Sequence, residues 1–367
     1  RERVSPALVG SSCLAQRERD DDLSRLDGTP RSLRLGANVV YAASVAVARA
    51  GASVKGQALH RYLAEVYGDP YRRYSPTPIC PLLSGGDLVS GGNLPVRSVL
   101  AMPLGPPKIE DKLAVLLAIT EALKGHVRAR GASTGHGALV VSPDGALVPP
   151  ALASDPFEAL LVALGLARDA IRSVGLDPER DVVLGVHVSA AGFYQHPVYA
   201  VGRSLTTSKR LLSLYRRAVD EYSLRWIEDG FAEEDLGGWE HQRRVFEDHP
   251  EVYLVGNDPV PASVFGLRRL LDLDLVNAVV LKPDRAGTLT SAFAFIQELG
   301  HRGVLPLLSS RTRDADVTLL GDLALATGTP LVRFGGLQRP EWRARYEHLL
   351  AVDRAEALRP ILARPRR

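Results

Sequence analysis

The sequence predicts an α/β barrel preceded by a mainly helical capping domain. Two observations predict the barrel. First, five apolar runs of strand length between residues 224 and 336 each end in polar residues. Second, segments with helical spacing separate these runs, at 263–273, 289–302 and 314–327. This alternation favours parallel strands joined by crossover helices, and the carboxyl ends of such strands meet at one mouth of a barrel.

The polar ends of the five runs are therefore expected to converge at the predicted mouth, although they lie far apart along the chain. In chain order they are Glu228, Asn257, Lys282, the Ser310–Arg311 pair and Arg333.

The first 75 residues differ from this pattern. A helix of small residues is predicted at 36–51, ended by Gly51, and a second helix at 57–67, ended by Gly68. Both are expected to pack on the barrel as a cap, and the proline-rich stretch 75–81 is predicted to be the linker into it. The expected parts of the chain are 1–76, 77–355 and a basic tail at 356–367.

Composition is that of a soluble, enzyme-sized protein. The chain has 367 residues, of which 46% are hydrophobic and 24% are charged, with a formal net charge of +3. No run of basic residues interleaves with aromatic residues, so nucleic-acid binding is not predicted. No uninterrupted apolar stretch is read as long enough to cross a bilayer. Cys13 and Cys80 lie far apart without metal-ligand spacing, which favours reduced thiols in a cytosolic protein.

Lys282 is the candidate that carries the most chemistry. It follows an apolar run that begins at Val279 and is one of only six lysines in a chain with 45 lysines and arginines. Burial at a strand end lowers the pKa of a lysine toward the range where it can take a proton at neutral pH. A strand-end lysine is more often a solvated charge, but the polar ends of the neighbouring runs favour a general base.

The helical run from Leu35 to Ala52 resembles part of the amino-terminal domain of the enolase family. Further motifs resemble enolases in the same order along nearly the whole chain, at 84–86, 184–194, 227–231, 255–258, 281–289, 309–312 and 322–323. The closing motif at 334–341 is similar to that of divergent enolase-like paralogues of sperm and flagella.

The resemblance implies a fold, an activity and a cofactor. Enolases have an α/β barrel and dehydrate 2-phosphoglycerate to phosphoenolpyruvate. A lysine, matched here by Lys282, removes the proton next to the carboxylate, and Mg²⁺ stabilises the dianion that forms. The resemblance also implies a cytoplasmic homodimer. The chain begins at Arg1 rather than at methionine, so a fragment or a processed product is expected, and the family's mobile amino-terminal loop is not matched within it.

The matched metal ligands depart from the family pattern. Glu228 matches the second of three carboxylate ligands, but the first aligns with His187 and the third with Asn257. Asp258 can substitute for the third only if the backbone shifts, because successive strand residues point to opposite faces. Since Mg²⁺ prefers charged oxygen ligands, its binding is expected to be weakened. A satisfied buried histidine is the alternative for His187.

Acid–base groups of the family are also replaced. The family's glutamate that helps expel the hydroxyl group falls within residues 140–145 of this chain, where Asp144 is the nearest acid and the candidate for that catalytic role. Ser98 aligns with a second catalytic glutamate. Ser310 stands where the family has a histidine, and it is expected to be among the substrate-binding residues.

The phosphate end of the pocket is better preserved. Arg311 and Thr312 match the residues that hold the substrate phosphate, and Arg333 replaces a lysine that contacts the substrate carboxylate. A structural salt bridge from Arg311 to Asp314 or Asp316 is an equal alternative.

Two functions from different classes follow. The favoured one is a pseudoenolase with weak or absent activity, used as a structural or anion-binding component of a cytoplasmic, flagellar or cytoskeletal assembly. The alternative is an active phosphopyruvate hydratase, a glycolytic lyase that uses Lys282 as its base.

Overall fold

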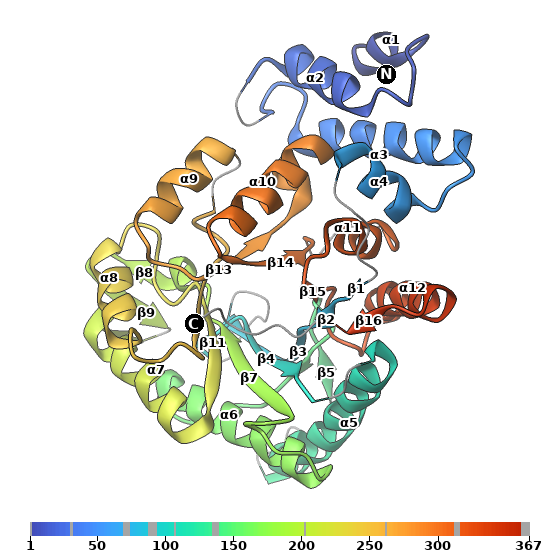
Figure 1. Ribbon diagram of the computed structural model, residues 1–367. Helices are drawn as coiled ribbons and strands as arrows, with labels where there is room; N and C mark the ends of the chain where they lie inside the picture. Colours follow the sequence, from blue (N-terminus) through green and yellow to red (C-terminus); the bar gives the residue numbers. More distant parts are fainter. Residues whose placement is uncertain are drawn as a thin grey trace.

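The computed structural model places two regions of the chain against one another, a barrel and a group of amino-terminal helices (Figure 1). The structure describes residues 2–29, 32–68, 74–86, 94–105, 108–133, 139–201, 203–260, 263–311 and 316–360.

One curled sheet forms the barrel, with the strand order β2-β15-β14-β13-β12-β11-β7-β4-β3-β6-β5. The barrel strands are β2 (Thr77–Pro78), β3 (Cys80–Ser84), β4 (Ser98–Pro103), β7 (Val182–His187), β11 (Leu224–Glu228), β12 (Tyr253–Gly256), β13 (Ala278–Leu281), β14 (Leu305–Ser309) and β15 (Leu331–Arg333). Strand β2 pairs with β15 at one end of this order, and β3, which begins two residues after β2 ends, pairs with β4 near the other end. The sheet therefore closes on itself. This confirms the predicted barrel. The short strands β5 (Val140–Val141) and β6 (Leu147–Val148) extend the sheet beside β3.

Strand β4 runs against both of its neighbours, whereas the other paired barrel strands are parallel. An apolar run carries no information about the direction of a strand, so the sequence did not reveal that β4 is antiparallel to its neighbours. Its consequence is local to the mouth. Ser98, the first residue of β4, pairs with Ser84 and His187, the last residues of β3 and β7.

The proline-rich stretch 75–81 is not a linker, and that prediction is wrong. Its residues belong largely to the barrel strands β2 and β3, and the N–H groups of Thr77 and Ile79 donate to carbonyls of Pro330 and Val332 at 2.8 Å. Pro78 stands between these donors, where the ladder needs no N–H from it.

Helices surround the barrel as crossover connections (Figure 1). They are α5 (Ile109–Ser133), α6 (Pro156–Ser173), α7 (Ser208–Tyr222), α8 (Leu236–Val245), α9 (Val264–Asp272), α10 (Leu289–His301), α11 (Leu319–Thr327) and α12 (Pro340–Glu356). Helices α9, α10 and α11 confirm the three predicted segments, although α11 begins only at Leu319 and residues 314 and 315 of the third segment lie outside the described residues. Ser263 and Thr288 cap α9 and α10 by accepting from backbone N–H groups in the first turn.

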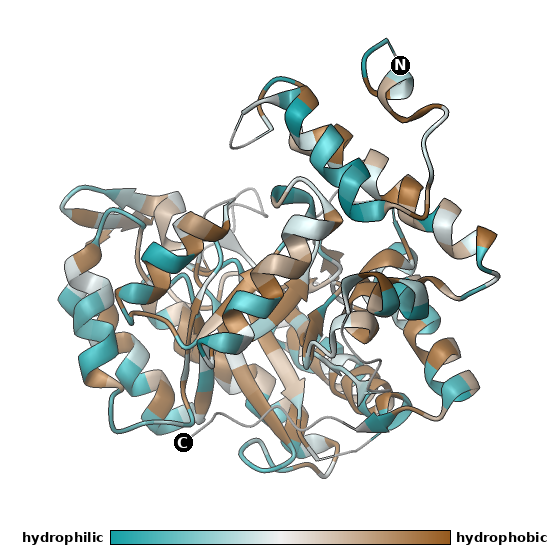
Figure 2. Ribbon diagram, turned by 45° about the horizontal axis from the view of Figure 1, so that its top comes forward, coloured by the Kyte–Doolittle hydropathy of each residue, from teal (hydrophilic) through white to brown (hydrophobic). Residues whose placement is uncertain are grey.

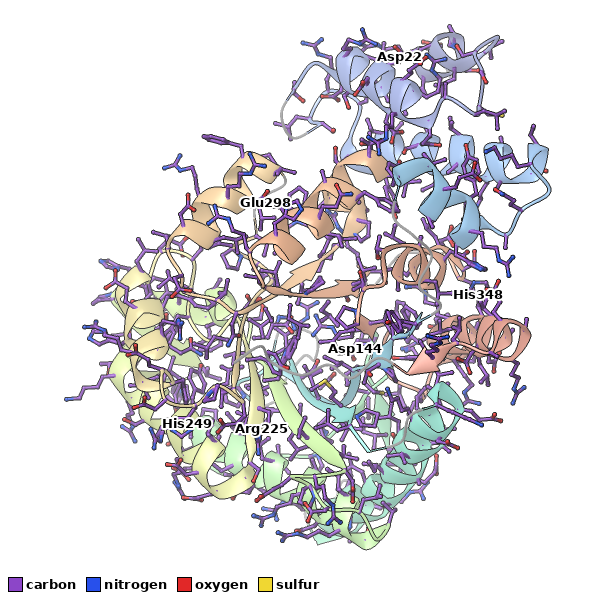
Figure 3. All side chains as sticks on the ribbon, viewed as in Figure 1. Asp22, Asp144, Arg225, His249, Glu298 and His348 are labelled. Atoms are coloured by element: carbon purple, nitrogen blue, oxygen red, sulfur yellow. The ribbon has the colours of Figure 1, made fainter. Side chains whose placement is uncertain are left out.

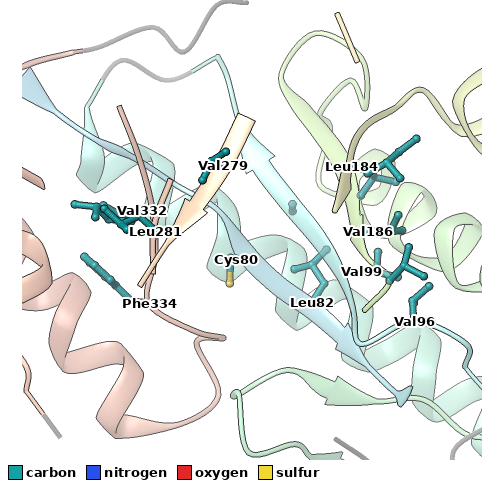
Figure 4. Packing of buried hydrophobic residues seen from close by; sticks show 14 of the residues in the cluster. Cys80, Leu82, Val96, Val99, Leu184, Val186, Val279, Leu281, Val332 and Phe334 are labelled. Carbon is teal, nitrogen blue, oxygen red and sulfur yellow. The ribbon is translucent and has the colours of Figure 1, made fainter. Parts of the chain in front are cut away.

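Side chains of the strands alternate between two apolar cores. One core fills the barrel and includes Trp226, Val255 and Val280. The other lies between the strands and the helices and includes Val279 and Leu281, which Figure 4 shows beside Val332 and Phe334. Figure 2 shows the apolar residues concentrated along the barrel strands.

Four helices precede the barrel: α1 (Val4–Leu8), α2 (Gln16–Asp27), α3 (Ala37–Val54) and α4 (Leu59–Tyr67). Helix α4 ends at Gly68 as predicted, in the left-handed conformation that glycine adopts readily. Helix α3 does not end at Gly51, because that glycine lies inside the helix where the Tyr62 ring packs against it.

Helix α3 is long and apolar enough, by length and composition, to cross a membrane, contrary to the expectation from the sequence. The core helix of a soluble protein passes the same test. Here 39% of the α3 window is buried within the structure, and the helix packs against α2 and α4.

Candidate active site at the barrel mouth

Strand periodicity gathers polar side chains at the mouth. Glu228, Asn257 and Lys282 are each an even number of residues from Trp226, Val255 and Val280, which point into the barrel. The mouth opens into a cavity of about 470 Å³. Its lining includes eight of the predicted site residues: Asp144, His187, Asn257, Asp258, Lys282, Ser310, Arg311 and Arg333. Glu228 is fully buried among them, and Thr312 lies outside the described residues.

An ion pair between Glu228 and Arg333 crosses the mouth from β11 to β15. Both guanidinium Nη atoms donate to the carboxylate, at 2.6 and 2.8 Å. The Glu228 carboxylate also accepts hydrogen bonds from Trp226 Nε1 at 3.0 Å and from Asn257 Nδ2 at 2.9 Å. Four N–H groups therefore occupy the two oxygens of Glu228. The sequence predicted Glu228 as a metal ligand and Arg333 as a substrate ligand, but in this structure the two side chains bind each other.

Electrostatics keep this pair charged. Burial alone would raise the pKa of Glu228, but the charge of Arg333 outweighs it, with help from His187, and the pKa of the carboxyl lies well below its ordinary value. The same pairing raises the pKa of Arg333 against the effect of burial.

His187 lies beside a second carboxylate, that of Asp229. His187 Nε2 is 3.3 Å from Asp229 Oδ2 and 3.5 Å from Glu228 Oε1. Asp229 also accepts from the backbone N–H groups of Asn257, at 2.8 Å, and of Asp258, at 3.1 and 3.2 Å. Burial is the main cause that raises the pKa of Asp229, and the Asp258 and Glu228 charges add to it.

Asp229 and Asp258 both reach the mouth because the backbone departs from strand geometry, a condition that the sequence analysis named for Asp258 but not for Asp229. Strand periodicity points Asp229 away from the barrel interior, but its φ of 49° turns the chain at that residue. Strand β12 ends at Gly256, so alternation no longer separates Asn257 from Asp258 and both line the cavity. The only signal for Asp229 in the sequence was that it directly follows the predicted site residue Glu228.

Lys282 follows the last residue of β13 and is half-buried. Burial lowers its pKa below the ordinary value of lysine, although the Asp258 charge acts against that shift. No carboxylate of the described residues lies within ion-pair distance of its Nζ. The ammonium group is therefore available to a ligand in the cavity.

Asp144 is held at the mouth by three serine hydroxyl groups. Ser84 Oγ donates to it at 2.8 and 2.9 Å, Ser98 Oγ donates at 3.1 Å, and Ser142 Oγ donates as well. Figure 3 labels Asp144 inside the ring of helices. Ser98, which the resemblance matched to a catalytic glutamate, thus helps to hold Asp144 in place.

Arg311 lies at the rim with its side chain 60% exposed and forms an ion pair with Asp284, its Nε 2.8 Å from Asp284 Oδ2. Asp316 pairs with Arg49 instead, and Asp314 lies outside the described residues. Neighbouring Ser310 accepts a hydrogen bond from the buried Arg345.

Comparison with known proteins matches both regions of the chain. The enolase C-terminal TIM barrel domain matches residues 73–359, and the enolase N-terminal domain matches residues 1–63. The enolases of Mycobacteroides abscessus and Acidothermus cellulolyticus are each 31% identical over 353 residues, which cover 96% of this chain and 78% of each relative. The chain belongs to the enolase family.

Membership of the enolase family implies dependence on Mg²⁺ and a 2-phosphoglycerate dehydratase type of function. The residues at the three aligned ligand positions fit this ion poorly. Glu228 already accepts four hydrogen bonds, His187 offers a nitrogen, and Asn257 offers only a neutral oxygen, whereas Mg²⁺ requires near-octahedral oxygen ligands. A further group of possible metal ligands at the mouth comprises His187, Asp229 and Asp258, whose ligand atoms all lie within 4.8 Å of one another.

Proposed function

We propose that this enolase-family protein binds a small phosphate- or carboxylate-bearing acid at its barrel mouth and dehydrates 2-phosphoglycerate weakly or not at all. The observation that carries the proposal is the bidentate ion pair of Arg333 with Glu228. It uses the one carboxylate that matches a family metal ligand.

The chemical reason is charge. Removing a proton next to a carboxylate creates a dianion, and that charge must be neutralised as it forms. With Glu228 paired internally and neutral or imidazole groups at Asn257 and His187, the aligned positions supply no carboxylates to hold a cation there. Loss of one group that stabilises developing negative charge costs about 10²- to 10³-fold in rate, so several losses support a strongly reduced turnover.

Anion binding is supported by the cations that remain. Lys282 has no carboxylate partner among the described residues, and Arg311 lies exposed at the rim, where it pairs with Asp284. An ammonium group and a guanidinium group around one cavity suit an acid with two negative groups.

Phosphoenolpyruvate formation tests the loss of turnover. Its ultraviolet absorbance is followed with 2-phosphoglycerate and saturating Mg²⁺ for the wild-type chain and for Lys282→Ala, with the Mycobacteroides abscessus enolase as the positive control. We expect both forms of this chain to remain at or near background. Robust turnover in the wild-type chain that disappears in Lys282→Ala would instead establish an active phosphopyruvate hydratase with Lys282 as its base.

We also propose, from family membership alone, that the chain works in the cytoplasm or the flagellum as a homodimer or as part of a cytoskeletal assembly. Light scattering of the purified chain tests the homodimer. A mass of about one chain across the micromolar range would contradict it.

A further inference from the structure

We propose that Arg345, a buried residue of α12, positions the hydroxyl group of Ser310 as a hydrogen-bond donor to the anion at the barrel mouth. The inference rests on the proposed anion-binding function and deepens it, because it gives the site a neutral donor that a side chain outside the cavity holds in place. Arg345 is a positioning residue, which acts on the ligand through Ser310.

The end of β14 fixes the place of Ser310. Ser309, the last residue of that strand, is buried, and its Oγ donates to the carbonyl of Arg333 at 3.1 Å. Ser310 follows directly, is half-buried and lines the mouth cavity together with Lys282 and Arg311. An anion that these two cations attract therefore enters the same cavity as the Ser310 hydroxyl group.

Arg345 controls the direction in which this hydroxyl group donates. Its Nη1 donates to Ser310 Oγ. A guanidinium group has donors only, whereas a hydroxyl group has one proton and two acceptor sites. Because Arg345 occupies an acceptor site, the Ser310 proton is left for another partner, and among the described residues Ser310 Oγ donates to none. The positive charge also polarises the O–H group and strengthens it as a donor to an anion in the cavity.

The guanidinium group of Arg345 is itself held in one orientation. It lies over the ring of Trp342, with its central carbon 4.8 Å from the ring centroid. Trp342 is 4% exposed, lines the same cavity and donates from Nε1 to the carbonyl of Pro143 at 3.1 Å. Arg345 is 2% exposed and does not line the cavity, so its effect on a ligand passes through Ser310.

A mutant cycle tests the inference by calorimetric titration of the full chain with 2-phosphoglycerate in the presence of a metal chelator. Ser310→Ala and Arg345→Gln should each weaken binding about tenfold, the effect of losing one hydrogen bond to a charged group. The double variant should bind within twofold of Ser310→Ala, because Arg345 acts through that hydroxyl group. The matched control is Arg343→Gln, at an exposed position of the same helix, which should stay within twofold of the wild type.

The double variant separates positioning from a purely structural role, which would lower the affinity with or without the Ser310 hydroxyl group. Thermal melts identify the folded variants. If Arg345→Gln does not fold, Arg345→Lys replaces it in the cycle with an expected loss of at least threefold, because lysine keeps the charge but not the planar, stacked group.

Unchanged affinity in Ser310→Ala or in the folded Arg345 variant would overturn the inference. A loss from the Arg345 substitution that persists in full in the Ser310→Ala background would also overturn it. A wild-type chain that does not bind 2-phosphoglycerate would instead overturn the proposed function together with this inference.

Discussion

At the scale of single residues, the guanidinium group of Arg333 binds the carboxylate of Glu228 across the mouth. It stands within hydrogen-bond distance of both Glu228 oxygens and shares them with Trp226 and Asn257. A buried pair of this kind is costly to break, because each group alone would be an uncompensated charge away from water. Arg333 thereby turns a potential metal ligand into part of the protein's own scaffold.

A double-mutant cycle at Glu228 and Arg333 measures this pairing. Glu228→Gln and Arg333→Gln should each lower the free energy of unfolding by about 3–5 kcal/mol, because each leaves its partner charged and buried. The double variant should lose much less than the sum of the two. Urea unfolding of the four proteins provides the measurement. If the loss in the double variant equals the sum of the two single losses to within about 1 kcal/mol, the two groups are not coupled.

Single residues are also where the sequence was least informative. Strand periodicity predicted that Glu228, Asn257 and Lys282 share one mouth, because that inference needs only the apolar runs before them. It could not reveal that Arg333 binds Glu228, since pairing depends on the separation of β11 and β15 across the barrel. It also could not reveal Asp229, which reaches the mouth through a φ of 49° at its own backbone.

At the scale of elements, buried polar contacts hold the amino-terminal helices on the barrel. Asp20 of α2 is 1% exposed and accepts from the N–H and Oγ1 of Thr290, at 2.9 and 2.6 Å, in the first turn of α10. Ser44 of α3 and Gln16 donate to the same carboxylate, at 2.6 and 2.9 Å. The hydroxyl of Tyr67, the last residue of α4, also donates to it at 3.4 Å, so one acid joins four helices.

Removal of this contact should loosen the helices. Asp20→Ala leaves several buried donors without an acceptor, so we expect a loss of at least about 1–3 kcal/mol in the free energy of unfolding. Asp21→Ala, at the exposed neighbouring position, is the control and should change it by less than about 0.5 kcal/mol. Equal effects of the two substitutions in urea unfolding would contradict the assigned role of Asp20.

A cluster of histidines and acids joins α4 to α11 and α12. His60 lies 3.2 Å from Asp322 and 2.8 Å from Glu356, and His348, labelled in Figure 3, lies 3.3 Å from Asp322. Burial disfavours the charged His60, but its bonds to Asp322 and Glu356 outweigh burial and raise its pKa above 6.5. Burial likewise opposes ionisation of Asp322, but the two histidines outweigh it and lower its pKa below 3.8.

These shifts give the docking of α4 a pH dependence with a definite sign. The raised pKa of His60 stabilises the folded state fully below about pH 6.5, and that contribution is lost as pH rises through the folded value. The lowered pKa of Asp322 stabilises the folded state above about pH 3.8, and that contribution is lost as pH falls through the folded value. Thermal melts should therefore show stability falling above pH 6.5 in the wild type and falling less in His60→Gln. The exposed control, His241→Gln, should follow the wild type, and an unchanged pH profile in His60→Gln would refute this assignment.

At the scale of the whole molecule, the ordered motifs along the sequence were sufficient to recognise the enolase family and its barrel. They were not sufficient to predict the direction of every strand or the residues at which the barrel begins. Strand β4 runs antiparallel, and strands β2 and β3 form despite Pro78 and Pro81, because only the closed sheet decides where those residues need no N–H donor. The chain therefore retains the family fold.

Calorimetric titration with 2-phosphoglycerate in the presence of a metal chelator tests the central claim most directly. If the cations of the protein hold the anion, the wild-type chain should bind one molecule per site without added metal. The affinity should fall at least tenfold in Lys282→Ala, and added Mg²⁺ should not produce phosphoenolpyruvate. Binding that appears only with Mg²⁺, accompanied by phosphoenolpyruvate formation, would contradict the account.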